Sequence, residues 1–172
     1  MSALDTHLAA GHLRPVVADP TRASGALSKA TEHRAASEAA AGRGLTAPAL
    51  ASAVQAGRSA LVGLTALAGY EVVLSTGALD TTLDAALCAV VETQWPELAT
   101  CAFAEAAERA EATTSPVAPA HIQEATAAAD ALIAALAAAQ GVSPAPFPQI
   151  TALGSRRTTS SRVAPERYRE PR

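Results

Sequence analysis

The feature that most limits how this chain can fold is the spacing of its small apolar residues, which follows the helical period of three and four. About a quarter of the 172 residues are alanine, the residue with the highest helix propensity, and only 3% are aromatic. No stretch shows the alternation of apolar and polar residues that a β-strand needs. The sequence therefore predicts an all-α protein. Because alanine buries little area, its core should be thin, which favours self-association or a protein partner.

Charge and proline content divide the chain into three segments. We expect an N-terminal arm with a short helix over residues 1–18, an antiparallel bundle of about five helices over 19–141, and a tail over 142–172. The tail has three prolines in its first seven residues and then many serines, threonines and arginines. Such a stretch cannot bury enough apolar surface to offset the entropy of ordering, so an extended or disordered tail is expected.

Capping residues, prolines and glycines set the limits of the expected helices. Ser2 and Asp5 have the spacing of a capping pair in a helix over about 2–13, and Asp19 precedes Pro20 at the start of the bundle. Gly77 is expected to end the longest helix and Asp80 to cap the next. The expected helices of the bundle cover about residues 20–41, 47–76, 80–95, 96–112 and 119–140.

The segment 47–76 is placed at the centre of the bundle, because apolar residues surround most of it. Its glycines at 57, 63 and 69 lower the helix propensity but permit close approach of neighbouring helices. In the last helix, six apolar residues at helical spacing are expected to face inward. They are Ile122, Ala125, Ala129, Leu132, Ile133 and Leu136.

The net charge of −3 hides an asymmetry between the body and the tail. Residues 1–141 hold 7 basic and 14 acidic side chains, a net charge of −7, and residues 142–172 hold 6 arginines and 2 glutamates, a net charge of +4. The tail is therefore expected to contact an acidic body or a neighbouring subunit, and nucleic acid is its less favoured ligand. The residues expected to make these contacts are Arg156, Arg157, Arg162, Arg167, Arg169 and Arg172.

Metal binding is not predicted, although His121 and Glu124 lie three residues apart on one expected helix. Di-iron sites in helical bundles need a glutamate followed three residues later by histidine on two helices, and here the order is reversed and occurs once. Glu105, Glu108 and Glu111 on the preceding helix are interpreted as solvated. Cys88 and Cys101 are expected to pack in the core, and a redox pair across the turn at Pro96 is the less favoured alternative.

No catalytic centre, cofactor site or targeting segment is predicted. The glycines are scattered rather than gathered in a phosphate-binding loop, and no nucleophile lies near a histidine and an acid. The start of the chain lacks the charged and apolar regions of a signal peptide, and the apolar run from Leu61 to Leu74 is short for a bilayer and contains Glu71. A cytoplasmic, non-enzymatic protein of a bacterium or phage, without membrane contact, is therefore expected.

Over residues 20–141 the order of features resembles an actinobacterial branch of the HEPN-like helical bundles. The residues that carry this resemblance are Pro96-Glu97-Leu98-Ala99, Phe103, Glu108-Arg109-Ala110, Glu124-Ala125 and Ala129-Asp130. The resemblance implies a bundle that pairs into dimers. Many members are RNases with an arginine followed four to six residues later by a histidine, and none of His7, His12, His33 and His121 has such an arginine upstream. The resemblance therefore implies a fold and a tendency to pair, without the RNase reaction.

Three functions follow from these observations. The first is a non-enzymatic bundle that acts by protein–protein association and oligomerisation, with the basic tail as a second contact element. The second is a structural subunit of a larger assembly, such as a phage head–tail or other virion component. The third, a HEPN-type protein acting on nucleotides or RNA, is disfavoured by the missing motif.

Overall fold

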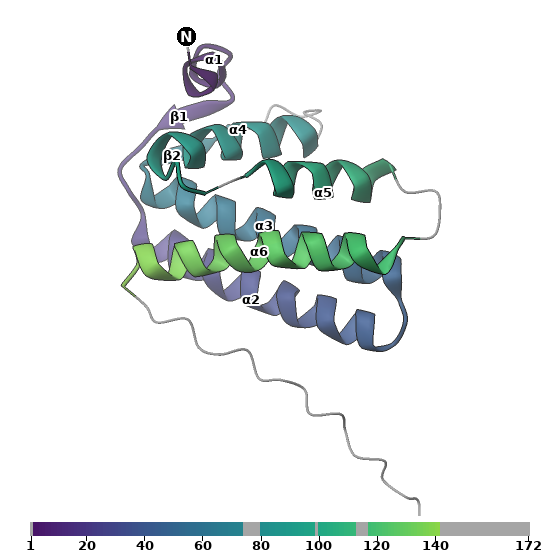
Figure 1. Cartoon of the computed structure of the whole chain (residues 1–172). Helices are drawn as coiled ribbons and strands as arrows, with labels where there is room; N and C mark the ends of the chain where they lie inside the picture. Colours follow the sequence, from purple (N-terminus) through teal and green to yellow (C-terminus); the bar gives the residue numbers. More distant parts are fainter. Residues whose placement is uncertain (1, 74–79, 99, 113–116, 142–172) are drawn as a thin grey trace, which may run out of the picture.

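The computed structural model describes residues 2–73, 80–98, 100–112 and 117–141 and confirms the all-α prediction. These residues form six helices and one two-stranded sheet (Figure 1). In chain order the elements are α1 (Ala3–Ala9), β1 (Leu13–Pro15), α2 (Pro20–Gly42), α3 (Thr46–Leu67), β2 (Tyr70–Val72), α4 (Asp80–Gln94), α5 (Cys101–Ala112) and α6 (Pro119–Ala139).

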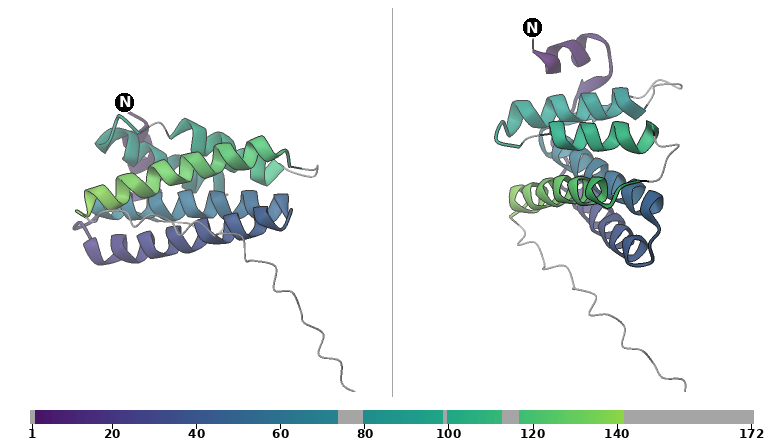
Figure 2. Two further views of the ribbon diagram at one scale, coloured as in Figure 1. Left: turned by 60° about the horizontal axis from the view of Figure 1, so that its bottom comes forward. Right: turned by 45° about the vertical axis from the view of Figure 1, so that its right-hand side comes forward.

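Helix α3 is the centre of the bundle, as the sequence predicts. It contacts α2, α4, α5 and α6, and Figure 2 shows α4 and α5 on one side of it and α2 and α6 on the other. Leu50, Leu61 and Leu64 of α3 are almost completely buried. The apolar stripe read from the sequence is therefore the core of the molecule.

Two glycines of α3 let neighbouring helices approach its backbone. A Cβ atom at Gly57 would lie 2.6 Å from two ring carbons of Phe103 on α5. A Cβ atom at Gly63 would lie 2.6 Å from Leu136 Cδ2 on α6 and 3.1 Å from Ala26 Cβ on α2. Real Cβ atoms essentially never come within 3.0 Å of another atom, so a side chain at either position would force Phe103 or Leu136 to shift.

The predicted caps of the first two helices are confirmed. The side chain of Ser2 accepts a hydrogen bond from the Asp5 N–H at 3.1 Å, and the Asp5 carboxylate accepts one from the Ser2 N–H at 2.9 Å. The bond from the Ser2 N–H lowers the pKa of Asp5 because it favours the ionised carboxylate. Asp19 accepts a hydrogen bond from the Arg22 N–H at 2.9 Å and so caps α2.

The expected absence of strands is wrong at two short segments. The predicted helix over 2–13 ends at Ala9, and Leu13–Pro15 forms β1. The predicted helix over 47–76 ends at Leu67, and Tyr70–Val72 forms β2, which is antiparallel to β1 with Leu13 opposite Val72. Gly77, which was expected to end that helix, lies outside the described residues, and Asp80 is the first residue of α4.

Gly69 explains why the long helix stops early. Its φ of +77° lies in the left-handed region, which favours glycine, and its carbonyl accepts a hydrogen bond from the Val16 N–H at 2.8 Å. The hydrogen bond from Val16 and the pairing of β1 with β2 thus replace the next turn of the helix.

The predicted start of the helix over 96–112 is also wrong, because α5 begins five residues later at Cys101. The Ala104 N–H donates to the Thr100 carbonyl at 3.0 Å, the first hydrogen bond of this helix. The buried Thr100 hydroxyl donates to the Glu92 carboxylate of α4. Thr100, rather than Pro96, therefore fixes where the helix begins.

We predict that Gly57→Ala lowers the free energy of unfolding. Alanine gains about 1 kcal/mol of helix propensity over glycine. Forcing a methyl group against the buried Phe103 ring costs about 1–3 kcal/mol, so we expect a net loss of up to about 2 kcal/mol. Urea unfolding measures it, and Gly42→Ala is the matched control, since a Cβ there meets no atom within 4 Å. A Gly57→Ala variant as stable as the control would show that this close approach is absent.

Candidate functional site on the outer face of helix α6

Helix α6 begins and ends at residues that suit those positions. Pro119 occupies its first turn, where backbone N–H groups have no partner within the helix, so a proline there loses no hydrogen bond. Gly141 follows the helix with a φ of +68°, in the left-handed region that favours glycine. The six predicted inward-facing residues are all buried, which confirms that prediction. Leu132 and Leu136 reach the glycines of α3, so the inner face of α6 belongs to the core.

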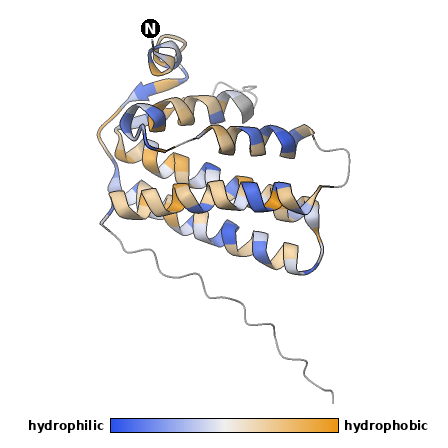
Figure 3. Cartoon of the chain, viewed as in Figure 1, coloured by the Kyte–Doolittle hydropathy of each residue, from blue (hydrophilic) through white to orange (hydrophobic). Residues whose placement is uncertain are grey.

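The opposite face of α6 is exposed, and its second half is apolar. We call this surface the α6 outer face; it exposes Gln123 and Glu124 in its first half and is otherwise formed by the exposed residues Ala120, Ala127, Ala131, Ala134 and Ala138. Only 39% of the residues in the most apolar stretch of α6 are buried. Figure 3 shows α6 in orange or pale colours over most of its length. A solvated helix normally carries charged residues on such a face, so this one is unusual.

The two acidic residues of α6 interact with neighbouring helices. Glu124 accepts a hydrogen bond from Arg109 of α5 at 2.6 Å. Asp130 accepts two from Arg34 of α2, at 2.7 and 3.3 Å. No charged residue follows between Ala131 and Gly141. The second half of the α6 outer face therefore presents only small uncharged side chains.

One described helix, α6, is long and apolar enough by length and composition to cross a membrane, a property that core helices of soluble proteins share. Its inner face packs against α3.

The residues considered for metal binding lie on α5 and α6, and three of the glutamates among them contact arginines. Arg109 contacts both Glu105 at 3.2 Å and Glu124 at 2.6 Å, and Glu111 lies 3.7 Å from Arg58 of α3. His121 is half-buried in the first turn of α6. Within the described ranges no three His, Cys, Asp or Glu side chains gather so that they could hold a metal ion.

The two cysteines differ in their surroundings. Cys88 on α4 is buried, as predicted, and burial raises the pKa of its thiol to about 11. Cys101 is exposed, so the predicted core position is wrong for this residue. The reason is the later start of α5. Phe103 in its first turn points inward, and Cys101, which lies two residues earlier on the helix, therefore points outward.

Sequence reasoning missed two ion pairs that connect the helices. Arg58 of α3 donates two hydrogen bonds of 2.7 Å to the buried Asp84 of α4, and Arg34 bridges α2 and α6 through Asp130. A lone arginine inside the apolar pattern of residues 47–76 was the available signal for the first. The six tail arginines predicted as contact residues lie outside the described residues.

Comparisons with known protein families, curated proteins and solved structures find no match to this chain.

We predict that a thiol reagent at about pH 8 modifies Cys101 and spares Cys88. Only the thiolate reacts, and a thiol with a pKa of about 11 is almost fully protonated at that pH. Mass spectrometry of the peptides after brief treatment with iodoacetamide measures both sites. Denatured protein is the control, since unfolding should make both cysteines reactive. Equal labelling of the two cysteines in the native protein would contradict the buried position of Cys88.

Proposed function

We propose that the protein acts without catalysis, by pairing with a second copy of itself through the α6 outer face. The observation that carries this proposal is the second half of α6, which has no charged residue and exposes a row of alanines while the inner face is buried. A second α6 outer face suits it, because small side chains let two helices approach within about 8 Å. The HEPN-like resemblance seen in the sequence also implies pairing, and it stays a prediction.

The size of this face indicates that α6 alone is too small for a stable interface. Its 21 residues span about 30 Å at about 1.5 Å per residue. A strip about 10 Å wide then covers roughly 300 Å², whereas a standard interface needs about 800 Å² from each partner. A second contact element is therefore part of the proposal.

The tail supplies that element. It continues directly from α6 and carries a net charge of +4. Exposed acidic residues gather at the opposite end of the α5–α6 pair, where they include Glu105, Glu108, Glu111 and Glu124. If two α6 helices pack antiparallel about a twofold axis, each tail starts beside this acidic end of its partner. The arginines then interact favourably with the partner's glutamates.

A subunit of a larger assembly is the second candidate, because exposed valines beside the small sheet form another apolar patch. Val16, Val17 and Val73 flank the small sheet and are 38%, 89% and 42% exposed. Two separate contact surfaces allow an open array, whereas one allows only a closed dimer. The mass of the assembly in solution distinguishes the two candidates.

The α6 outer face is tested by the double substitution Ala131→Glu and Ala134→Glu. Two carboxylates in the proposed interface would be buried without partners, so we expect the dissociation constant of the dimer to rise about 100-fold or more. Glutamate is a good helix former, so circular dichroism should be unchanged. Sedimentation velocity measures the association.

The control for this variant is Ala36→Glu combined with Ala39→Glu, at exposed positions with the same spacing on α2. This pair should leave the dimer intact. Equal association of the test variant and the control would exclude the α6 outer face as the interface.

Deletion of residues 142–172 tests the tail. We expect the deleted chain to keep its helical content and to associate more weakly, with less dependence on salt. Charges at the surface are screened over about 8 Å at physiological ionic strength, so the full chain should lose affinity as salt rises. Sedimentation at two salt concentrations, with and without a short DNA duplex, measures both effects.

Two outcomes would contradict this role of the tail. The first is an unchanged dimer after deletion. The second is an unchanged dimer together with the loss of a steeply salt-dependent affinity for the duplex, which would assign the tail to nucleic acid.

A further inference from the structure

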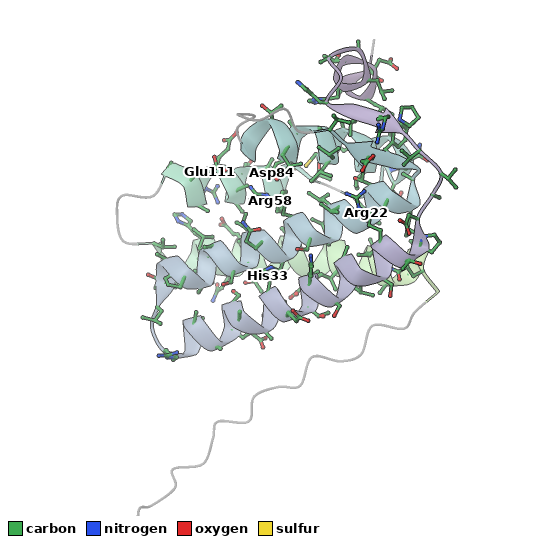
Figure 4. The ribbon with its side chains drawn as sticks, turned by 180° about the vertical axis from the view of Figure 1, so that it is seen from behind. Arg22, His33, Arg58, Asp84 and Glu111 are labelled. Carbon is green, nitrogen blue, oxygen red and sulfur yellow. The ribbon has the colours of Figure 1, made fainter. Side chains whose placement is uncertain are left out.

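A groove between α2 and α3 has features that neither the association of the bundle nor its core explains. It lies on the face of the bundle away from α6 and has a volume of about 500 Å³. This volume is typical of sites for small molecules. Figure 4 shows this side of the molecule, with Arg22 of α2 and Arg58 of α3 labelled.

The side chains that line the groove are basic or uncharged, although the described body as a whole is acidic. Its cations are Arg22, Lys29 and Arg58, and among the described residues no carboxylate lines it. Asp84 and Glu111 offset part of the charge of Arg58, since their carboxylate oxygens lie 2.7 and 3.7 Å from its Nη2 atom. The remaining positive potential therefore comes mainly from Arg22 and Lys29.

Neither of these two side chains is strongly engaged by an acid. Arg22 makes one long contact of 3.4 Å with Glu71, whose other carboxylate oxygen lies 2.5 Å from Arg14. Lys29 makes no ion pair within the part of the chain that the structure describes. Both side chains are exposed on α2, seven residues and thus about two turns apart. An anion in the groove can therefore be contacted by both.

A smaller hollow continues from the Arg22 end of the groove. It has a volume of about 180 Å³, shares Arg22 and Val62 with the groove, and is otherwise lined mainly by apolar side chains. A cavity of about 150 Å³ is enough to hold a benzene ring. Thr65 also lines this hollow, although its hydroxyl is buried. The hollow therefore suits a small ring or branched apolar group.

Gly25 leaves the backbone of α2 open on the wall of the groove. A Cβ atom there would meet no atom of the described residues within 4 Å. A ligand in the groove can therefore lie closer to α2 at this position than at one that bears a side chain.

From these observations we infer that the groove binds a small phosphate monoester, with the phosphate between Arg22 and Lys29 and a short apolar group in the hollow. A phosphate suits the site because its several oxygens accept hydrogen bonds from a guanidinium and an ammonium group at the same time. Arg58, held by Asp84, closes the far side of the groove. This inference is independent of the proposed dimer, whose interface lies on the other side of the bundle.

Phenyl phosphate is the probe that tests the inference, by calorimetric titration of the full chain at constant ionic strength. Inorganic phosphate, benzoate and benzyl alcohol separate the contributions of the phosphate and the ring. We expect saturable binding of phenyl phosphate, weaker binding of inorganic phosphate and of benzoate, and no detectable binding of benzyl alcohol. Benzoate binding as tightly as phenyl phosphate would overturn the assignment of a phosphate.

Two pairs of variants locate the site. Lys29→Ala removes a cation of the groove, and Arg43→Gln removes an exposed cation just beyond the end of α2. Gly25→Ala adds a methyl group to the groove wall, and Gly42→Ala adds one where a Cβ also meets no atom. We expect Lys29→Ala and Gly25→Ala to weaken the binding of phenyl phosphate about tenfold, as the loss of one charged contact or close approach does. Both variants should unfold no more easily than the parent.

The controls Arg43→Gln and Gly42→Ala should bind phenyl phosphate within about twofold of the parent, because they lie outside the groove. Binding that falls equally in a groove variant and its control would show a general effect of charge or helix content and would overturn the inference. The absence of saturable binding to the parent chain would overturn it as well.

Discussion

The close approach of α5 and α6 to the backbone of α3 is the constraint on which the rest of the structure depends. Gly57 and Gly63 leave room for Phe103 and Leu136, which are two of the largest completely buried side chains. In a chain with so many alanines, these few large groups contribute much of the apolar area that can be buried. Two positions without side chains on α3 therefore allow the helices of a thin-cored bundle to pack closely.

Ion pairs then fix how the helices sit around α3. Arg58 joins α3 to Asp84 of α4, and Arg34 joins α2 to Asp130 of α6. The side chains of the first pair are only 12% and 6% exposed. The free-energy cost of removing two charges from water is about as large as their electrostatic attraction. These pairs therefore contribute more to the relative placement of the helices than to net stability. The second pair also directs Asp130, one of the two carboxylates of α6, toward α2.

The helical period of the sequence was enough to predict the helices and the inward residues of α6, because that spacing records directly which side of a helix is buried. It could not predict the end of α3, since a single glycine in an apolar run is compatible with a helix. The hydrogen bond between Val16 and the Gly69 carbonyl decides this point, and it joins segments far apart in the chain. The exposure of Cys101 and the groove between α2 and α3 likewise depend on helix starts and contacts that no local pattern contains. The tail arginines were evident from composition, and they lie outside the described residues.

The proposed pairing gives these features one physical account, in which a bundle with a thin core gains further burial by covering the α6 outer face with a second copy. Sedimentation equilibrium of the unmodified full-length chain, over a range of concentrations at physiological salt, tests this claim most directly. The account predicts a reversible equilibrium between monomer and dimer, with the dimer dominant at high concentration. A single species with the mass of the monomer at every concentration would contradict it.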